Sequence, residues 1–334
     1  MNPRIAITIG DKNGIGPEVV LKSLSHPNLP KDANYCVISP AEIIKAWGNR
    51  LGIDAFSIPV VKFDKISEYP QSFVEPPFAG NDRTLEPGAA TRESGELAAA
   101  SIEYAAKLAM DGRVDAIVTA PISKLALRMA GFQFPGHTEF LAHLSGDSTP
   151  VMLLIAGEFR VAVATTHLAL KDVPQALTQE RLLKVACVLD DELKTRFGIS
   201  EPKIALTGLN PHAGESGEFG REEIEVISPA IEKLRKEGVR AEGPFPADAL
   251  FSRIRTVQKY DAYLTMYHDQ GLIPVKMLAA GKGVNYTCGL PFVRTSPDHG
   301  TAFEIAGKNV ASPESMLEAI RLAVATVRRS RVGS

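Results

Sequence analysis

Short apolar runs rich in β-branched residues alternate with amphipathic stretches along the whole chain. This alternation is typical of an α/β fold in which helices flank mostly parallel sheets. We predict strands at residues 4–9, 35–39, 116–119, 161–165, 203–209 and 262–266. Helical periodicity predicts helices at residues 94–110, 178–197, 221–236 and 313–328.

The chain has 334 residues, which is enough for one large domain or two lobes. Hydrophobic residues make up 45% and charged residues 23%, the usual balance of a globular protein. The formal net charge of −2 argues against nucleic acid or an anionic membrane as the main partner. Attraction for a phosphorylated ligand would therefore have to be local.

The first apolar run reaches Gly10 and Asp11 almost at once, so it is too short for a signal peptide or a membrane span. The three cysteines, Cys36, Cys187 and Cys288, are far apart, and no CxxC spacing occurs. We interpret them as reduced thiols and expect a cytoplasmic protein.

Three of the seven histidines, His167, His212 and His268, each close an apolar run and open a polar turn. The carboxyl ends of parallel strands line the ligand crevice of an α/β sheet, so these imidazoles could converge on one metal ion. A single histidine of this kind is more often bonded to backbone, but the threefold repetition favours a metal site. Asp248 and Asp269 are either partners of this site or surface aspartates, and spacing does not decide between them.

His137 and Thr138 follow a Pro-Gly turn and are candidates for binding an anionic substrate; the alternative is that Thr138 is only a helix N-cap. Lys276, Asn285 and Arg294 flank a glycine-rich stretch and are candidates for binding carboxylate or phosphate. A solvated surface is the alternative for any one of them, but their proximity to His268 in the sequence favours binding.

Two glycine-containing stretches bear on a cofactor. Residues 10–18 follow a strand and enter a helix, but they do not match the dinucleotide pattern GxGxxG. Residues 298–308, which include Gly300, Thr301 and Ala302, are either a ligand loop or a bent connection before the last helix.

The motifs GDKNGIGPE, TAPISK, FPGHTEF, TTHLALKDV, GLNPHAGESGEFG, FPADALF, MYHDQGLIPVK and GVNYTCGLPFVRTSPDHGTAFEIAGK occur in this order. In this order they resemble the 4-hydroxythreonine-4-phosphate dehydrogenase family of pyridoxine biosynthesis, from Ile5 to beyond Lys308. That family is similar in fold to the isocitrate and isopropylmalate dehydrogenases. The resemblance implies two lobes, with the active site in the cleft between them. We expect a cofactor-side lobe at residues 1–130 and 300–334, and a substrate, metal and dimerisation lobe at residues 131–299.

The resemblance also implies roles for the candidate residues. His167, His212 and His268 would bind one divalent ion (zinc, magnesium or cobalt) in a site shared across a homodimer interface. The substrate contacts would be His137, Thr138, Lys276, Asn285 and Arg294. NAD or NADP would contact the loop that contains Gly300, Thr301 and Ala302.

The implied reaction is oxidation of the C3 hydroxyl of 4-phosphooxy-L-threonine, followed by loss of carbon dioxide to give 3-amino-2-oxopropyl phosphate. Either Lys276 or Asp248 would take the hydroxyl proton. The chain departs from the common family pattern at Lys12-Asn13 (usually Pro-Ala), Ala249 (often Thr) and Pro297 (usually aliphatic). The alternatives are a paralogue acting on D-threonate or D-erythronate 4-phosphate and, from another class, a non-redox metalloprotein that binds phosphate.

Overall fold

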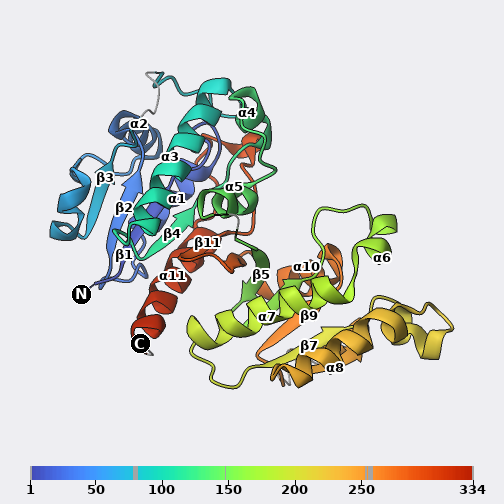
Figure 1. Ribbon diagram of the computed structural model, residues 1–334. Helices are drawn as coiled ribbons and strands as arrows, with labels where there is room; N and C mark the ends of the chain where they lie inside the picture. The colour runs from blue at the N-terminus through green and yellow to red at the C-terminus, as the bar shows by residue number, and fades with distance from the viewer. Residues whose placement is uncertain (1, 78–81, 147, 253, 255–258, 333–334) are drawn as a thin grey trace. The chain divides into compact units, whose positions relative to one another are not determined.

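The computed structural model describes residues 2–77, 82–146, 148–252, 254 and 259–332. The chain forms two compact units, one comprising residues 1–150 and 290–328 and the other residues 151–289 and 329–334 (Figure 1). None of the described helices is long and apolar enough to cross a membrane. The domain boundaries expected from the sequence, at residues 130/131 and 299/300, stay a prediction.

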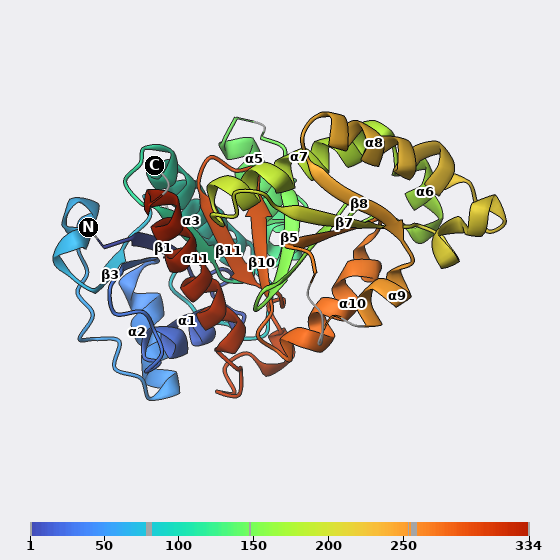
Figure 2. The ribbon, with the colours of Figure 1, turned by 90° about the horizontal axis from the view of Figure 1, so that it is seen from below.

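The first unit is built on parallel strands in the order β3-β2-β1-β4-β11. Helix α3 packs across β1, β2 and β4, and Figure 2 shows α1, α2 and α11 on the opposite face. Strands and helices of this unit are β1 (Arg4–Thr8), α1 (Gly16–Leu24), β2 (Asn34–Ile38), α2 (Ala41–Leu51), β3 (Gln71–Val74), α3 (Arg92–Met110), β4 (Ala116–Thr119), α4 (Lys124–Met129), α5 (His137–Leu144), β11 (Val293–Pro297) and α11 (Glu314–Val332), with short 3-10 turns at Phe63–Glu68 and Phe303–Ile305.

The second unit has the strand order β10-β5-β6-β9-β7-β8. Strand β5 runs antiparallel to both β10 and β6, whereas β6, β9, β7 and β8 are parallel. Its strands and helices are β5 (Val151–Ala156), β6 (Phe159–Val163), α6 (Val173–Ala176), α7 (Gln179–Thr195), β7 (Lys203–Thr207), a π turn (Glu223–Ile227), α8 (Ser228–Lys236), β8 (Arg240–Phe245), α9 (Ala247–Ser252), β9 (Ala262–Thr265), α10 (His268–Ala279) and β10 (Val284–Cys288), with tight turns at Leu170–Asp172 and Pro211–Gly217.

Buried apolar strands explain why these segments pair as they do. Positions 5–8 of β1 and all of β4, β6 and β9 are buried, as expected for strands covered on both faces. Helix α7 covers β5 and β10, while α10 packs against β5, β6 and β9. The mostly parallel α/β class predicted from the sequence is confirmed, with β5 as the antiparallel exception.

Helix α3 begins earlier than the periodicity predicted. The Thr91 side chain accepts a hydrogen bond from the Ser94 backbone N–H at 3.1 Å, and the Ser94 hydroxyl accepts one from the Thr91 N–H at 3.3 Å. This reciprocal capping box satisfies two backbone donors at the helix end. It also fixes the position of Ser94, which contacts the loop after β1.

Candidate active site

Arg294 is the buried arginine among the candidate substrate residues of the first unit. Arg294, on β11, is 2% exposed, and its Nε and Nη2 donate to Thr119 Oγ1 at 3.2 and 2.6 Å. Burial lowers the pKa of Arg294 to about 10 despite the opposing effect of the Glu139 carboxylate. The guanidinium is therefore still a cation at neutral pH, and it is held in place by the last residue of β4.

His137 lies close enough to Arg294 for the guanidinium charge to lower its pKa. Burial, and then the positive charge of Arg294, lower the pKa of His137 well below the usual value, so the ring is neutral at pH 7. Its Nε2 is buried without a hydrogen-bond partner in the described part of the chain. A buried polar atom without a partner inside the chain is free to bond a ligand, which is compatible with the predicted role of His137.

Thr138 follows His137 in the first turn of α5 and is partly buried. The helix N-cap is Gly136, and no side chain caps this end. The N-cap interpretation of Thr138 is therefore wrong, because α5 begins one residue before it. Thr138 is instead the second residue of the helix.

In the second unit, His167 and His268 lie together. Their ring centroids are 6.2 Å apart, and both line a cavity of about 290 Å³ that also includes Asp269. His268 begins α10, and its Nδ1 is 2.7 Å from Asp269 Oδ1, a contact that fixes the orientation of the ring. His167 has a φ of 53°, a strained backbone conformation that is concentrated at functional sites.

His212 lies in the turn after β7, and its ring centroid is 6.2 Å from that of Phe219. The backbone is left-handed at every residue from 212 to 217, including three that are neither glycine nor histidine. Across residues 2–77, 82–146, 148–252, 254 and 259–332, no three metal-binding side chains of the single chain are arranged to hold an ion. The three-histidine site stays a prediction.

Two polar side chains, Glu223 and Gln270, bind the turn that follows β7, and the sequence analysis missed both. Glu223, only 3% exposed, accepts hydrogen bonds from the backbone of Leu209 and Asn210 at 2.7 Å each and from Asn210 Nδ2 at 2.9 Å. Gln270 Nε2 donates to Gly208 O at 2.7 Å, and Gln270 Oε1 accepts from the Thr207 hydroxyl at 2.8 Å. Together they fix the end of β7 relative to the start of α10. The only signal in the sequence was the position of Gln270, two residues after the predicted ligand His268, whereas the burial of Glu223 is visible only in the structure.

The remaining candidates of this unit are spread over three elements. Asp248, on α9, lines a cavity of about 580 Å³ together with apolar residues of α10. Lys276 is exposed on α10. Asn285, on β10, has its Oδ1 buried without a partner in the described residues, as does His137 Nε2 in the first unit.

The loop before α11 carries the predicted cofactor residues. His299 Nε2 is buried without a described partner, and Gly300 has open space where a side chain would project. Thr301 O accepts a hydrogen bond from the Ile15 N–H at 3.0 Å, and Ala302 has a φ of 41°. An orphaned donor or acceptor beside an open glycine fits a polar ligand such as a dinucleotide.

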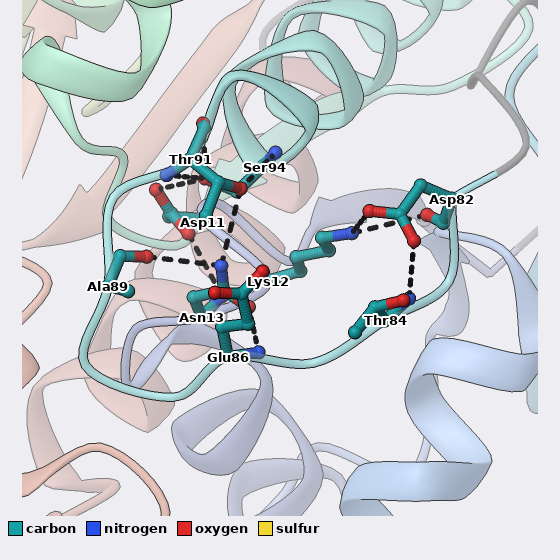
Figure 3. Close-up of polar contacts among 9 residues, drawn as sticks. All are labelled: Asp11, Lys12, Asn13, Asp82, Thr84, Glu86, Ala89, Thr91 and Ser94. Carbon is teal, nitrogen blue, oxygen red and sulfur yellow. Dashed lines mark hydrogen bonds and ion pairs between the residues drawn. The ribbon is translucent and has the colours of Figure 1, made fainter.

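A buried polar network follows β1 in the same unit (Figure 3). Asp11 is fully buried; its Oδ1 accepts from the Asn13 N–H at 2.9 Å and its Oδ2 from the Ser94 hydroxyl at 3.0 Å. Burial raises the pKa of Asp11 even though these hydrogen bonds oppose the shift. This network is the second feature that the sequence analysis missed.

Comparison with known proteins identifies relatives over nearly the whole chain. The family described as "Pyridoxal phosphate biosynthetic protein PdxA" matches residues 33–323. A 4-hydroxythreonine-4-phosphate dehydrogenase of Thioalkalivibrio sulfidiphilus is 45% identical over 334 aligned residues, covering 98% of this chain and 97% of the relative. A Bradyrhizobium diazoefficiens protein named "Putative D-threonate 4-phosphate dehydrogenase" is also 45% identical, covering 95% of this chain and 94% of its own.

Solved structures agree. The crystal structure of 4-hydroxythreonine-4-phosphate dehydrogenase from Klebsiella pneumoniae superposes with a TM-score of 0.87 at 40% identity, covering 97% of this chain and 100% of that one. Isocitrate dehydrogenase from Methylococcus capsulatus has a TM-score of 0.51 at 14% identity, covering 98% of this chain and 88% of that one, a likeness of fold alone. The fold relationship predicted from the sequence is confirmed.

Proposed function

Because this chain belongs to the pyridoxal phosphate biosynthetic protein PdxA family, we propose that it oxidises 4-phosphooxy-L-threonine with NAD or NADP. The oxidised product is a β-keto acid that loses carbon dioxide to give 3-amino-2-oxopropyl phosphate. The observation that carries the proposal is the state of the predicted substrate residues. His137 Nε2 and Asn285 Oδ1 are buried without described partners, and Arg294 is a buried cation.

These residues suit a small phosphorylated amino acid. Arg294 supplies a fixed positive charge for phosphate or carboxylate, with Thr119 holding its orientation. Neutral His137 offers a hydrogen bond without adding a charge, and Thr138 follows it in α5. Exposed Lys276, in the other unit, stays a predicted substrate contact. All of these side chains are polar, so they favour a small polar substrate over a large apolar one.

The donor set around His167 suits a divalent cation such as zinc, cobalt or magnesium. Two imidazoles line one cavity, and Asp269 orients one of them. We propose that the partner's His212 completes the set in a homodimer. When bound, the ion would supply positive charge that stabilises negative charge on the substrate oxygen.

A homodimer is supported by exposed apolar side chains around these cavities. Ile273 is 60% and Met277 70% exposed on α10, where both line the 580 Å³ cavity with Asp248, and Leu170 is 68% exposed beside His167. Exposed apolar side chains that share one open cavity, as Ile273 and Met277 do, are typical of subunit interfaces.

The reaction moves one hydride and one proton before decarboxylation. We propose that Gly300, Thr301 and Ala302 would hold NAD or NADP, which when bound would supply the acceptor for the hydride from C3. The proton leaves the C3 hydroxyl for Asp248 or Lys276, and both remain candidates for this base. The carboxylate would then leave as carbon dioxide, and the electrons of the broken carbon–carbon bond would form an enolate that takes up one proton on carbon to give the ketone.

A paralogous activity on D-threonate or D-erythronate 4-phosphate has support from the equally identical Bradyrhizobium relative. The two substrates differ in whether an amino or a hydroxyl group is next to the reacting carbon. A non-redox metalloprotein that binds phosphate is the alternative from another class. We also propose a cytoplasmic setting, which the free thiols Cys36, Cys187 and Cys288 support.

A substrate panel tests the proposal. We expect reduced nicotinamide to form with 4-phosphooxy-L-threonine, to form more slowly with threonate 4-phosphate, and to fall by at least about a hundredfold with a chelator. Turnover of threonate 4-phosphate alone would assign the paralogous activity instead. Metal binding without dinucleotide reduction by any phosphorylated hydroxy acid would favour the non-redox alternative.

A further inference from the structure

Asn13 holds a segment far from it in sequence. The residue is fully buried in the loop between β1 and α1, and it uses both ends of its amide on residues 82–91 (Figure 3). Its Nδ2 donates to Ala89 O at 3.1 Å, and its Oδ1 accepts from the Glu86 N–H at 2.9 Å. Its backbone oxygen accepts from the Gly88 N–H at 2.8 Å. Three hydrogen bonds from one residue therefore fix the backbone of this segment.

Lys12 holds the other end of the same segment. Its side chain is 1% exposed, and its Nζ lies 3.1 Å from Asp82 O and 3.3 Å from Asp82 Oδ2. The Thr84 backbone N–H, and then Lys12, lower the pKa of Asp82 to about 2, so the carboxylate is charged at neutral pH. Burying an ammonium group is costly unless it is paired, so the pair keeps segment 82–91 in place.

The loop after β1, which carries Lys12 and Asn13, and segment 82–91 both contact the loop before α11. The Ile15 N–H, three residues after Lys12, donates to Thr301 O at 3.0 Å. Gly88 lies so close to that loop that a Cβ on it would be 3.1 Å from Phe303 O, and its φ is 95°. Segment 82–91, the loop after β1 and the loop that contains Thr301 therefore form one contiguous assembly within the first unit.

We propose that segment 82–91 borders the nicotinamide dinucleotide, and that Lys12 and Asn13 are positioning residues that hold it beside the loop at 299–306. The inference rests on the proposed assignment of the cofactor to Gly300, Thr301 and Ala302. Lys12 and Asn13 are buried, so they act through the backbone of segment 82–91 and do not touch the dinucleotide. Loss of either tether should weaken dinucleotide binding and leave binding of the phosphorylated substrate unchanged.

The molecule contains its own probe for this test. Trp47 is the single tryptophan, is fully buried, and donates from Nε1 to the backbone oxygen of Lys12 at 2.9 Å. Energy transfer from Trp47 to bound NADH or NADPH would report dinucleotide binding without turnover. Its emission alone would report whether the loop after β1 keeps its structure.

The variants are Asn13→Ala and Lys12→Met, titrated with NADH and NADPH. We expect the Kd for the preferred dinucleotide to rise about tenfold or more in each, which corresponds to about 1.4 kcal/mol. The Kd for phosphorylated substrate should stay within about twofold of the wild type. In steady state, KM for the dinucleotide should rise more than kcat falls.

Arg4→Met is the matched control, because it removes another ion pair of the same unit, Arg4 Nη2 to Asp115 Oδ1 at 3.3 Å, at the opposite end of β1. It should lower thermal stability without changing dinucleotide affinity. If Lys12→Met does not fold, Asp82→Asn weakens the same pair from its exposed side.

Unchanged dinucleotide affinity in folded Asn13→Ala and in a folded Lys12 or Asp82 variant would overturn the inference. Wild-type protein that binds neither dinucleotide would instead reject the proposed function.

Discussion

The most informative single residues are buried polar side chains whose partners are distant in sequence. Arg294 meets Thr119, and Gln270 meets Gly208, across 175 and 62 positions. The sequence predicts Arg294 as a binding residue because arginine in a glycine-rich stretch is a recognisable signal. It does not predict Thr119 or Gln270, because their importance comes only from what the fold places beside them.

Asp11 provides a test at this scale. Burial raises its pKa, so the folded chain retains the proton in a range where the unfolded chain has lost it. The unfolding free energy should therefore fall as the pH rises from 3.8 through the folded pKa, and then stay lower. Asp11→Asn keeps an acceptor for the Asn13 N–H, and its amide can donate to the Ser94 hydroxyl, so no partner is lost.

We expect Asp11→Asn to equal or exceed the wild type by up to about 1–2 kcal/mol near neutral pH, with the advantage shrinking towards about pH 4. Urea unfolding of both proteins across that range measures the difference. Asp191→Asn, an exposed change on α7, is the control. A difference that grows as the pH falls would contradict the assigned direction.

At the scale of elements, the six predicted strands are apolar runs, but β3, β5, β8, β10 and β11 were not predicted, and β5 was missed although it is itself an apolar run. β1, β2, β4, β6, β7 and β9 lie within about two residues of their predicted positions because continuous apolar runs mark them. β11 was not predicted because Arg294, Thr295 and Ser296 are polar residues that become buried. β8 was not predicted because Gly243-Pro244 interrupts this edge strand. Buried polar pairing is invisible to a hydrophobic pattern.

The helix predicted at residues 221–236 is a π turn, Glu223–Ile227, followed by α8. Pro229 near the start of α8 lacks a backbone N–H and cannot make the i→i−4 bond of a continuous helix. The wider turn places Glu223 where it accepts hydrogen bonds from the turn after β7. A local helix defect thus supports a loop that carries His212.

The contact between α3 and α4 provides the second test. Gly95 is inside α3, and a Cβ there would lie 2.1 Å from Ala126 O of α4. Glycine to alanine in a free helix stabilises by up to about 1 kcal/mol. Here the methyl group must push the two helices apart, so we expect Gly95→Ala to lower the unfolding free energy by about 1–3 kcal/mol.

Chemical denaturation measures this change, and Glu103→Ala on the exposed face of α3 should stay within about 0.5 kcal/mol of the wild type. If Gly95→Ala instead raised the unfolding free energy, α4 would have moved away from α3 without loss of stability, and the prediction would be wrong.

At the scale of the whole molecule, the sequence predicted an α/β chain without a linker, and the structure has two compact units that the chain enters more than once. Motif order predicted the family, because long motifs are specific over nearly the whole chain. The oligomeric state could not be predicted in the same way, because exposed apolar residues such as Ile273 and Met277 are the main sign of a subunit interface in a single chain.

Subunit mixing tests the shared metal site. In one chain, His167 and His268 line the same cavity, so we propose that His212 reaches it from the partner. His212→Ala and His268→Ala should each be inactive with reduced metal content. A heterodimer of these two variants has one site lacking two ligands and one intact site, so random mixing should restore about a quarter of wild-type activity.

The control mixture is His167→Ala with His268→Ala. If these two ligands come from one chain, every site in that heterodimer lacks one ligand and the mixture stays inactive. Activity and metal content after co-refolding measure both mixtures. Recovery in the control mixture but not in the mixture with His212→Ala would reverse the assignment. His212 and His268 would then come from one subunit and His167 from the other. No recovery in either mixture of confirmed heterodimers would place all three ligands in one subunit, and the shared site would then be wrong.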